Sequence, residues 1–253
     1  MFSGLPATGL MMRADYHITT GQLGFVLGCL GLGVAVSDIV WGLLADRFGD
    51  RRILLTGLTA TGLLLAAMTA AAAPGADTGV TRLGALLFAA GALGGSVNGS
   101  SGRAVMTWFT DAQRGFAMSV RQTAIPAGGA IGVAVLPPVA SAFGFRAVFL
   151  VLAAFCLASA AATWRWLHEP ASAEHDADEP EDAPTVARPG PPRSPLRRWV
   201  VWRVALASAL LTVPQIAVLS FAGIYLGDAK GTGATAGAVA VITAQVGGGA
   251  VRI

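Results

Sequence analysis

The strongest constraint on the fold is a succession of long apolar runs that fill most of the chain. Each run is about 20 residues long, the length of helix that crosses the roughly 30 Å hydrocarbon core of a bilayer. Charged residues make up 12% of the sequence and hydrophobic residues 54%, whereas a soluble domain averages about 25% charged residues. The sequence predicts seven spans, at residues 21–44, 53–73, 83–102, 122–145, 147–164, 204–227 and 231–251.

Two other classes of structure also contain apolar runs. One run of this length is compatible with a buried helix of a soluble protein, but seven in succession, joined by short polar segments, favour a membrane protein. The strands of a membrane barrel alternate apolar and polar residues, and these runs do not alternate. Residues 1–12 are also apolar but too few to cross. We therefore expect an all-α polytopic membrane protein.

The basic residues are distributed unevenly between the two sides that alternating spans define. Short cytoplasmic loops of membrane proteins are enriched in Lys and Arg. One side collects most of the arginines, including Arg47, Arg51, Arg52, Arg103, Arg114 and Arg165, whereas the other has only Arg13, Arg82, Arg146 and Lys230. This bias predicts that the first side is cytoplasmic. The net charge of +3 then reflects topology, and we expect no nucleic-acid partner.

One long hydrophilic stretch, residues 167–198, divides the chain. It is rich in Pro, Ala, Asp and Glu, a composition that buries too little apolar surface to offset the entropy of ordering. We interpret it as a disordered cytoplasmic linker between residues 1–166 and residues 199–253. A regulatory or partner-binding tail is the functional alternative.

The joint between the first two spans carries a dense set of glycines and charges. It reads Gly-Leu-Leu-Ala-Asp-Arg-Phe-Gly-Asp-Arg-Arg from Gly42 to Arg52, and its shortness predicts that the two helices lie antiparallel side by side. Glycines permit close approach of helices, and arginines donate charge-assisted hydrogen bonds to carboxylates or helix-end carbonyls. We expect a gating latch formed by Gly42, Asp46, Arg47, Gly49, Arg51 and Arg52. Alternatively, these arginines only follow the cytoplasmic bias.

This hairpin resembles the signature of the major facilitator superfamily, in which Gly, Asp, a basic residue, Gly and two basic residues recur at the same spacing. Residues 103–109, Arg114, Gly115 and residues 121–126 are similar to the region between the fourth and fifth helices of bacterial members. The resemblance implies a bundle of about twelve helices. It assigns residues 1–166 to an N-terminal half with an incomplete first helix, and residues 199–253 to the first two helices of a C-terminal half. We therefore expect a fragment truncated at both ends.

Polar residues inside the spans are candidates for solute binding or ion coupling, because polar groups are costly in hydrocarbon. Asp38 lies about 12 Å along the helix from Asp46 at 1.5 Å per residue, which suits a proton or cation site. Alternatively it is hydrated or paired with Arg103 or Arg121. Arg121 suits an anionic substrate, or else extends to the lipid headgroups. The remaining candidates are Asn98, Gln122 and Gln215, and such side chains also hold helices together.

The resemblance implies secondary active transport of a small solute by alternating access, coupled to protons or other cations, in a bacterial plasma membrane. The lipid bilayer and a small-molecule substrate are then the partners. We expect no enzymatic activity and no cofactor, because no constellation of catalytic residues shares one depth. Cys29 and Cys156 lie inside apolar spans, so we expect neither a disulfide nor a metal site. The alternatives are a non-functional truncated fragment, or a receptor or subunit that keeps the transporter fold.

Overall fold

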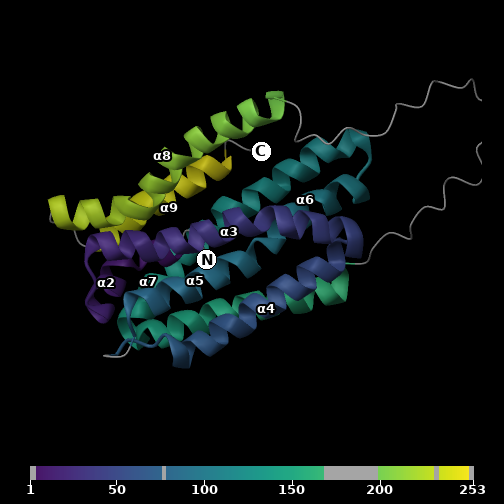
Figure 1. Ribbon diagram of the computed structural model, residues 1–253. Coiled ribbons are helices and arrows are strands. Elements are labelled where there is room, and N and C mark those ends of the chain that lie inside the picture. The colour runs from purple at the N-terminus through teal and green to yellow at the C-terminus, as the bar shows by residue number, and fades with distance from the viewer. Residues whose placement is uncertain (1–3, 76–77, 168–198, 231–233, 251–253) are drawn as a thin grey trace, which may run out of the picture.

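A computed structural model describes residues 4–75, 78–167, 199–230 and 234–250, and the ordered elements in this part of the chain are helices that form a bundle (Figure 1). Five stretches are long and apolar enough to cross a membrane: Thr20–Phe48, Asp50–Ala71, Val80–Met106, Asp111–Trp166 and Trp199–Val218. The helices are α1 (Gly4–Ala7), α2 (Gly9–Tyr16), α3 (Thr20–Phe48), α4 (Asp50–Ala71), α5 (Val80–Gly94), α6 (Ser96–Trp108), α7 (Asp111–Trp166), α8 (Trp199–Lys230) and α9 (Ala234–Ala250). The all-α membrane architecture expected from the sequence is confirmed.

The division of the chain into helices differs from the predicted spans in two places. The 56-residue α7 contains both the fourth and the fifth predicted span, and Gly144 marks the bend between them with a φ of 72° and a ψ of −179°. The third predicted span is divided between α5 and α6 at Gly95. The apolar run at residues 1–12 contributes α1 and the start of α2, which pack against α7.

The helices do not pack in the order of the chain. α3 packs mainly on α5, and α4 mainly on α7, whereas α3 and α4 contact each other much less. The expectation that the hairpin helices lie side by side was therefore wrong along most of their length. The reason is that small residues favour other pairs: a Cβ on Gly33 would lie 2.1 Å from the Phe88 carbonyl oxygen, and one on Gly91 would lie 2.1 Å from that of Leu30.

A buried aromatic group holds together the end of the bundle away from the hairpin. The Tyr16 ring meets the Phe145 ring edge to face, with centroids 5.4 Å apart, and Phe145 lies 6.2 Å from Phe149. The Tyr16 hydroxyl donates a hydrogen bond to the Ala72 carbonyl. These contacts join α2, the end of α4 and the segment of α7 that follows the bend.

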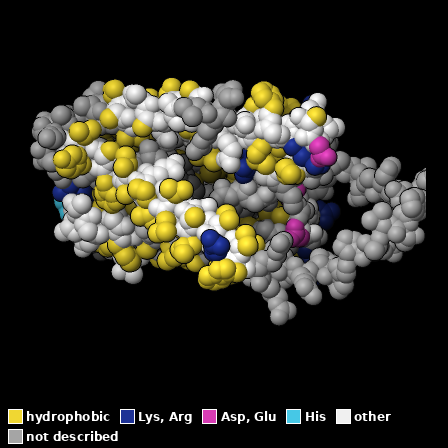
Figure 2. Space-filling model, turned by 90° about the horizontal axis from the view of Figure 1, so that it is seen from above, with side chains coloured by type: hydrophobic (Ala, Val, Ile, Leu, Met, Phe, Trp, Pro, Cys, Tyr) yellow, Lys and Arg dark blue, Asp and Glu magenta, His cyan; other side chains and the backbone are white. Residues whose placement is uncertain are grey.

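The outer surface suits a lipid environment. Large apolar side chains are exposed along α8, including Leu211, which is 75% exposed. Figure 2 shows hydrophobic side chains over much of one face, with the acidic and most of the basic side chains toward one end. The predicted linker at residues 167–198 lies, beyond Leu167, outside the described residues.

Candidate functional site

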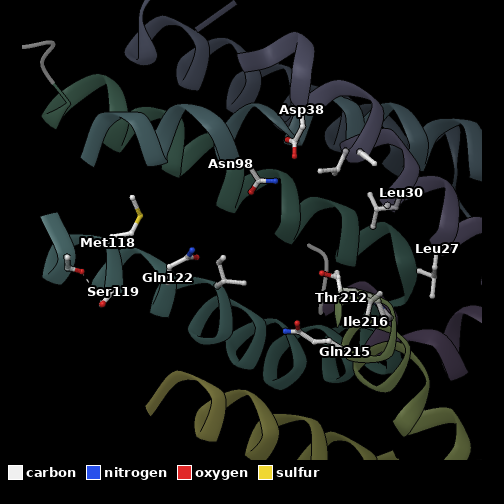
Figure 3. Close-up of a pocket in the computed structure, with 16 residues that line it drawn as sticks. Leu27, Leu30, Asp38, Asn98, Met118, Ser119, Gln122, Thr212, Gln215 and Ile216 are labelled. Atoms are coloured by element: carbon white, nitrogen blue, oxygen red, sulfur yellow. Dashed lines mark hydrogen bonds between the residues drawn. The ribbon is translucent and has the colours of Figure 1, made fainter. Parts of the chain in front are cut away.

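A cavity of about 1080 Å³ lies where the first helices of the chain meet α8. Its walls come from α1, α3, α6, α7 and α8 (Figure 3). Most of the lining is aliphatic, with Leu27, Leu30 and Val34 on α3, Ile125 on α7 and Ile216 on α8. The cavity therefore separates residues 4–166 from the helix that begins the segment after residue 198.

Four of the five candidate polar residues line this cavity, although they come from four helices. Asp38 lies on α3, Asn98 on α6, Gln122 on α7 and Gln215 on α8. Ser119 and Thr212 also line it, although neither was among the candidates predicted from the sequence. Each lies three residues before a predicted glutamine, so the helical i,i+3 spacing would have placed both on the same faces.

Asp38 faces the junction between α5 and α6. Its Oδ1 lies 3.4 Å from the position that a Cβ on Gly95 would occupy. The Asp38 carboxylate and the Asn98 amide both point into the cavity from facing helices (Figure 3). Among the described residues Asp38 takes part in no ion pair, and no group of three His, Cys, Asp or Glu is placed to hold a metal ion. The side chain of Arg103, one expected partner, is not among those that the structure describes.

Arg121, the fifth candidate, is not among the residues that line the cavity. Its Nε donates to the Ser101 hydroxyl at 3.0 Å, and an Nη donates to the backbone carbonyl of Asn98 at 2.7 Å. It lines a separate groove with Phe109 and Phe116. Arg121 thus binds α7 to α6 immediately behind the residue that faces Asp38.

Within the hairpin, Gly49 is the single residue between α3 and α4. Gly49 has a φ of 86° and a ψ of 155°, and its N–H donates to the Ala45 carbonyl at 3.0 Å. This left-handed φ favours glycine, so the backbone conformation accounts for Gly49. A Cβ on Gly42 would meet nothing within 4 Å, whereas a Cβ on Gly99 of α6 would lie 4.0 Å from the Gly42 Cα.

The charged side chains of the hairpin lie at one end of the bundle. An Nη of Arg51 donates to the Trp164 carbonyl at 2.9 Å, which attaches the start of α4 to the end of α7. Asp46, Arg47 and Arg52 are exposed, and the Arg47 guanidinium lies 5.5 Å from the centre of the Phe48 ring. The hydrogen bond of Arg51 stays within residues 4–166, whereas the latch was expected to grip the opposite half.

The sequence matches the family model of the Major Facilitator Superfamily over residues 1–253. The chain belongs to this family. It is therefore a member of a transporter family in a multi-pass membrane fold, as the resemblance of the hairpin indicated, and the family is not one of enzymes.

Several bacterial members of the superfamily are similar in sequence. An uncharacterized MFS-type transporter of Mycobacterium tuberculosis is 33% identical over 87% of this chain and 46% of its own length. A probable sulfoacetate transporter of Cupriavidus necator is 31% identical over 58% of the chain and 33% of its own length. The glycerol-3-phosphate transporter of Bacillus subtilis is 25% identical over 83% and 50%. The chain thus spans about half the length, or less, of these curated relatives.

Proposed function

We propose that the chain forms part of a secondary transporter that moves a small solute across the membrane by alternating access. The observation that carries this proposal is the convergence of four polar side chains, from four apolar helices, on one cavity. Polar groups inside membrane helices are costly and mark solute or ion pathways. In this kind of transporter the substrate site lies between the two halves, which corresponds to the boundary between residues 4–166 and α8.

The transport step is coupled to an ion gradient through Asp38. Its carboxylate lines the cavity from the middle of a span, together with the amide of Asn98 on α6. A proton or another cation bound there would change the charge of the cavity. If the new charge stabilises the inward-facing or the outward-facing conformation more than the other, the ion binds the two conformations with different affinities. Coupling requires such a difference.

The hairpin acts as the gate, on the cytoplasmic side of a bacterial plasma membrane. The arginines in the joints between helices at this end of the bundle support the cytoplasmic placement of the hairpin. Support for gating comes from the exposure of Asp46, Arg47 and Arg52 at this end of the bundle, where water competes for every partner. The linker at residues 167–198 would lie on the same side.

Uptake into proteoliposomes tests the proposal. The purified protein is reconstituted, a pH gradient is imposed, and entry of labelled glucuronate, glycerol 3-phosphate and benzyltrimethylammonium is measured. We expect gradient-driven uptake of at least one solute, with lower initial rates in Asp46→Asn and Asp38→Asn. Asp111→Asn is the control, because Asp111 is 89% exposed at the start of α7 and is not among the residues that line the cavity.

The same experiment separates the alternatives. Solute binding without uptake would favour a receptor or subunit that keeps the transporter fold. Absence of both binding and uptake across the three solutes would favour a non-functional fragment. Uptake that is equal in the wild type, Asp46→Asn and Asp38→Asn would leave transport in place but remove both proposed roles.

A further inference from the structure

The charge on the lining of the cavity between residues 4–166 and α8 is of one sign, negative. Among the described residues that line it, Asp38 is the only ionisable side chain, and none is Lys, Arg or His. The other polar groups are the amides of Asn98, Gln122 and Gln215 and the hydroxyls of Ser119 and Thr212. Amides and hydroxyls accept hydrogen bonds as readily as they donate them, so they add no preference for an anion.

Arg121 lies on the helix α7 that helps to form the cavity and precedes the lining residue Gln122, but it is not itself among the lining residues. The Arg121 guanidinium donates to the Asn98 carbonyl and the Ser101 hydroxyl of α6. The groove that it lines includes Val105, Phe109 and Phe116 and shares no lining residue with the cavity. An anionic solute would therefore meet the Asp38 carboxylate without a compensating arginine from this wall.

The aliphatic part of the lining favours a ligand with an apolar body. Leu27 and Leu30 line the α3 wall, Ile125 lines the α7 wall and Ile216 lines the α8 wall. In Figure 3, Leu27 and Leu30 lie along the same wall as Asp38, and Ile216 lies beyond Thr212. Apolar groups in a ligand gain free energy when they leave water for such surroundings. A carboxylate at one place and aliphatic side chains beside it match a positive head with an apolar body.

We propose that this cavity binds an organic cation, with its ammonium group at Asp38 and its apolar body against the leucines and isoleucines. The inference rests on the proposed function, because it names the solute class of the same cavity. It contrasts with the solutes in the names of the relatives, which include sulfoacetate and glycerol 3-phosphate. The cationic group supplies the counter-charge that Asp38 lacks among the described side chains.

A matched pair of probes tests the charge preference. Benzyltrimethylammonium and benzylsulfonate share a benzyl group and a tetrahedral head and differ in the sign of the charge. Thermal unfolding of the purified chain in detergent is followed by tryptophan fluorescence during titration with each probe, because a ligand that binds the folded state raises the midpoint. We expect the cation to raise the midpoint of the wild type and of Asp111→Asn, with apparent affinity about tenfold or more weaker in Asp38→Asn. Benzylsulfonate should have little effect.

A second pair of variants covers the case in which Asp38→Asn does not fold. Gln215→Arg places a positive charge on the α8 wall, and Gln215→Leu is its neutral control. We expect Gln215→Arg to weaken the response to the cation more than Gln215→Leu does. The proposal is overturned by a larger response to benzylsulfonate, by an equal cation response in Asp38→Asn, or by no response to either probe.

The outcomes of the binding and uptake experiments distinguish a failure of this inference from a failure of the proposed function. Cation binding that depends on Asp38, without uptake of any solute, supports this inference and contradicts the proposed transport. Uptake of glucuronate that is unaffected by Asp38→Asn supports transport and contradicts the inference.

Discussion

At the scale of single residues, two glycines of one motif have different roles. Gly49 adopts a positive φ that glycine tolerates best, whereas Gly42 lies inside α3 with free space at its Cβ position. We expect Gly49→Ala to lower the free energy of unfolding by about 1–3 kcal/mol because of backbone strain. Gly42→Ala should be neutral, or stabilising by up to about 1 kcal/mol through helix propensity. Thermal unfolding of the two variants in the same detergent checks this, and equal destabilisation would contradict it.

Two arginines near the start of α7 give a second residue-scale comparison. Arg121 is partly buried and bonds to another helix, whereas Arg114 pairs with the exposed Asp111 on its own helix and donates to the Phe109 carbonyl. Hydrogen bonds from a charged group contribute about 1.5–3 kcal/mol, and exposed ion pairs about 0–1 kcal/mol. We therefore expect Arg121→Gln to destabilise the protein more than Arg114→Gln. The unfolding midpoints measure this difference, and the reverse order would show that Arg121 contributes little to the α6–α7 contact.

At the scale of elements, the contact between α3 and α5 depends on the absence of two side chains. A Cβ on Gly33 or Gly91 would overlap a backbone carbonyl of the other helix, so the helices would have to move apart. We expect Gly33→Ala or Gly91→Ala to cost about 1–3 kcal/mol, as overpacking does elsewhere. Gly28→Ala in the same helix α3 is the control, because its Cβ would meet nothing within 4 Å. If the Gly28 and Gly33 variants unfold at the same temperature, the close seam is not present in solution.

The sequence predicted the positions of the helices better than it predicted which helices pack against each other. Apolar length and charge placed helical segments at each predicted span, because the bilayer restricts spanning segments to helices or barrels. Hydrophobicity alone did not show that α4 packs on α7 rather than on α3, since all these helices are apolar around their circumference. Nor did it show that Gly144, rather than the following Arg146, marks the bend in α7. These features depend on glycine contacts and backbone angles that become visible only when the helices are assembled.

At the scale of the whole molecule, the predicted sidedness can be measured directly. The α6–α7 joint at Thr110 and the α4–α5 joint at Gly75 lie at opposite ends of the spans, since one span separates them. In a variant with Cys29 and Cys156 replaced by serine, we expect Gly75→Cys to react with a membrane-impermeant maleimide in intact cells. Thr110→Cys should react only after permeabilisation. The opposite pattern would invert the proposed topology and place the hairpin outside the cell.

Only part of the cavity lining could be predicted from the sequence. Asp38, Asn98, Gln122 and Gln215 stood out because each is polar within an apolar run, and the structure brings them together. Arg121 stood out by the same criterion but points to α6, because its direction depends on the carbonyl of Asn98 and the hydroxyl of Ser101. A polar residue within a span therefore indicates a costly group, but its orientation decides whether it meets a solute.

The single-residue joint at Gly49 has a mechanical consequence for transport. It connects α3, which packs on α5, to α4, which packs on α7. Since α3 and α7 both line the cavity, neither helix pair can rotate far without carrying the other. We expect residues 4–166 to move as one rigid body, so that the cavity opens along its boundary with α8 and the joint transmits motion without acting as a hinge.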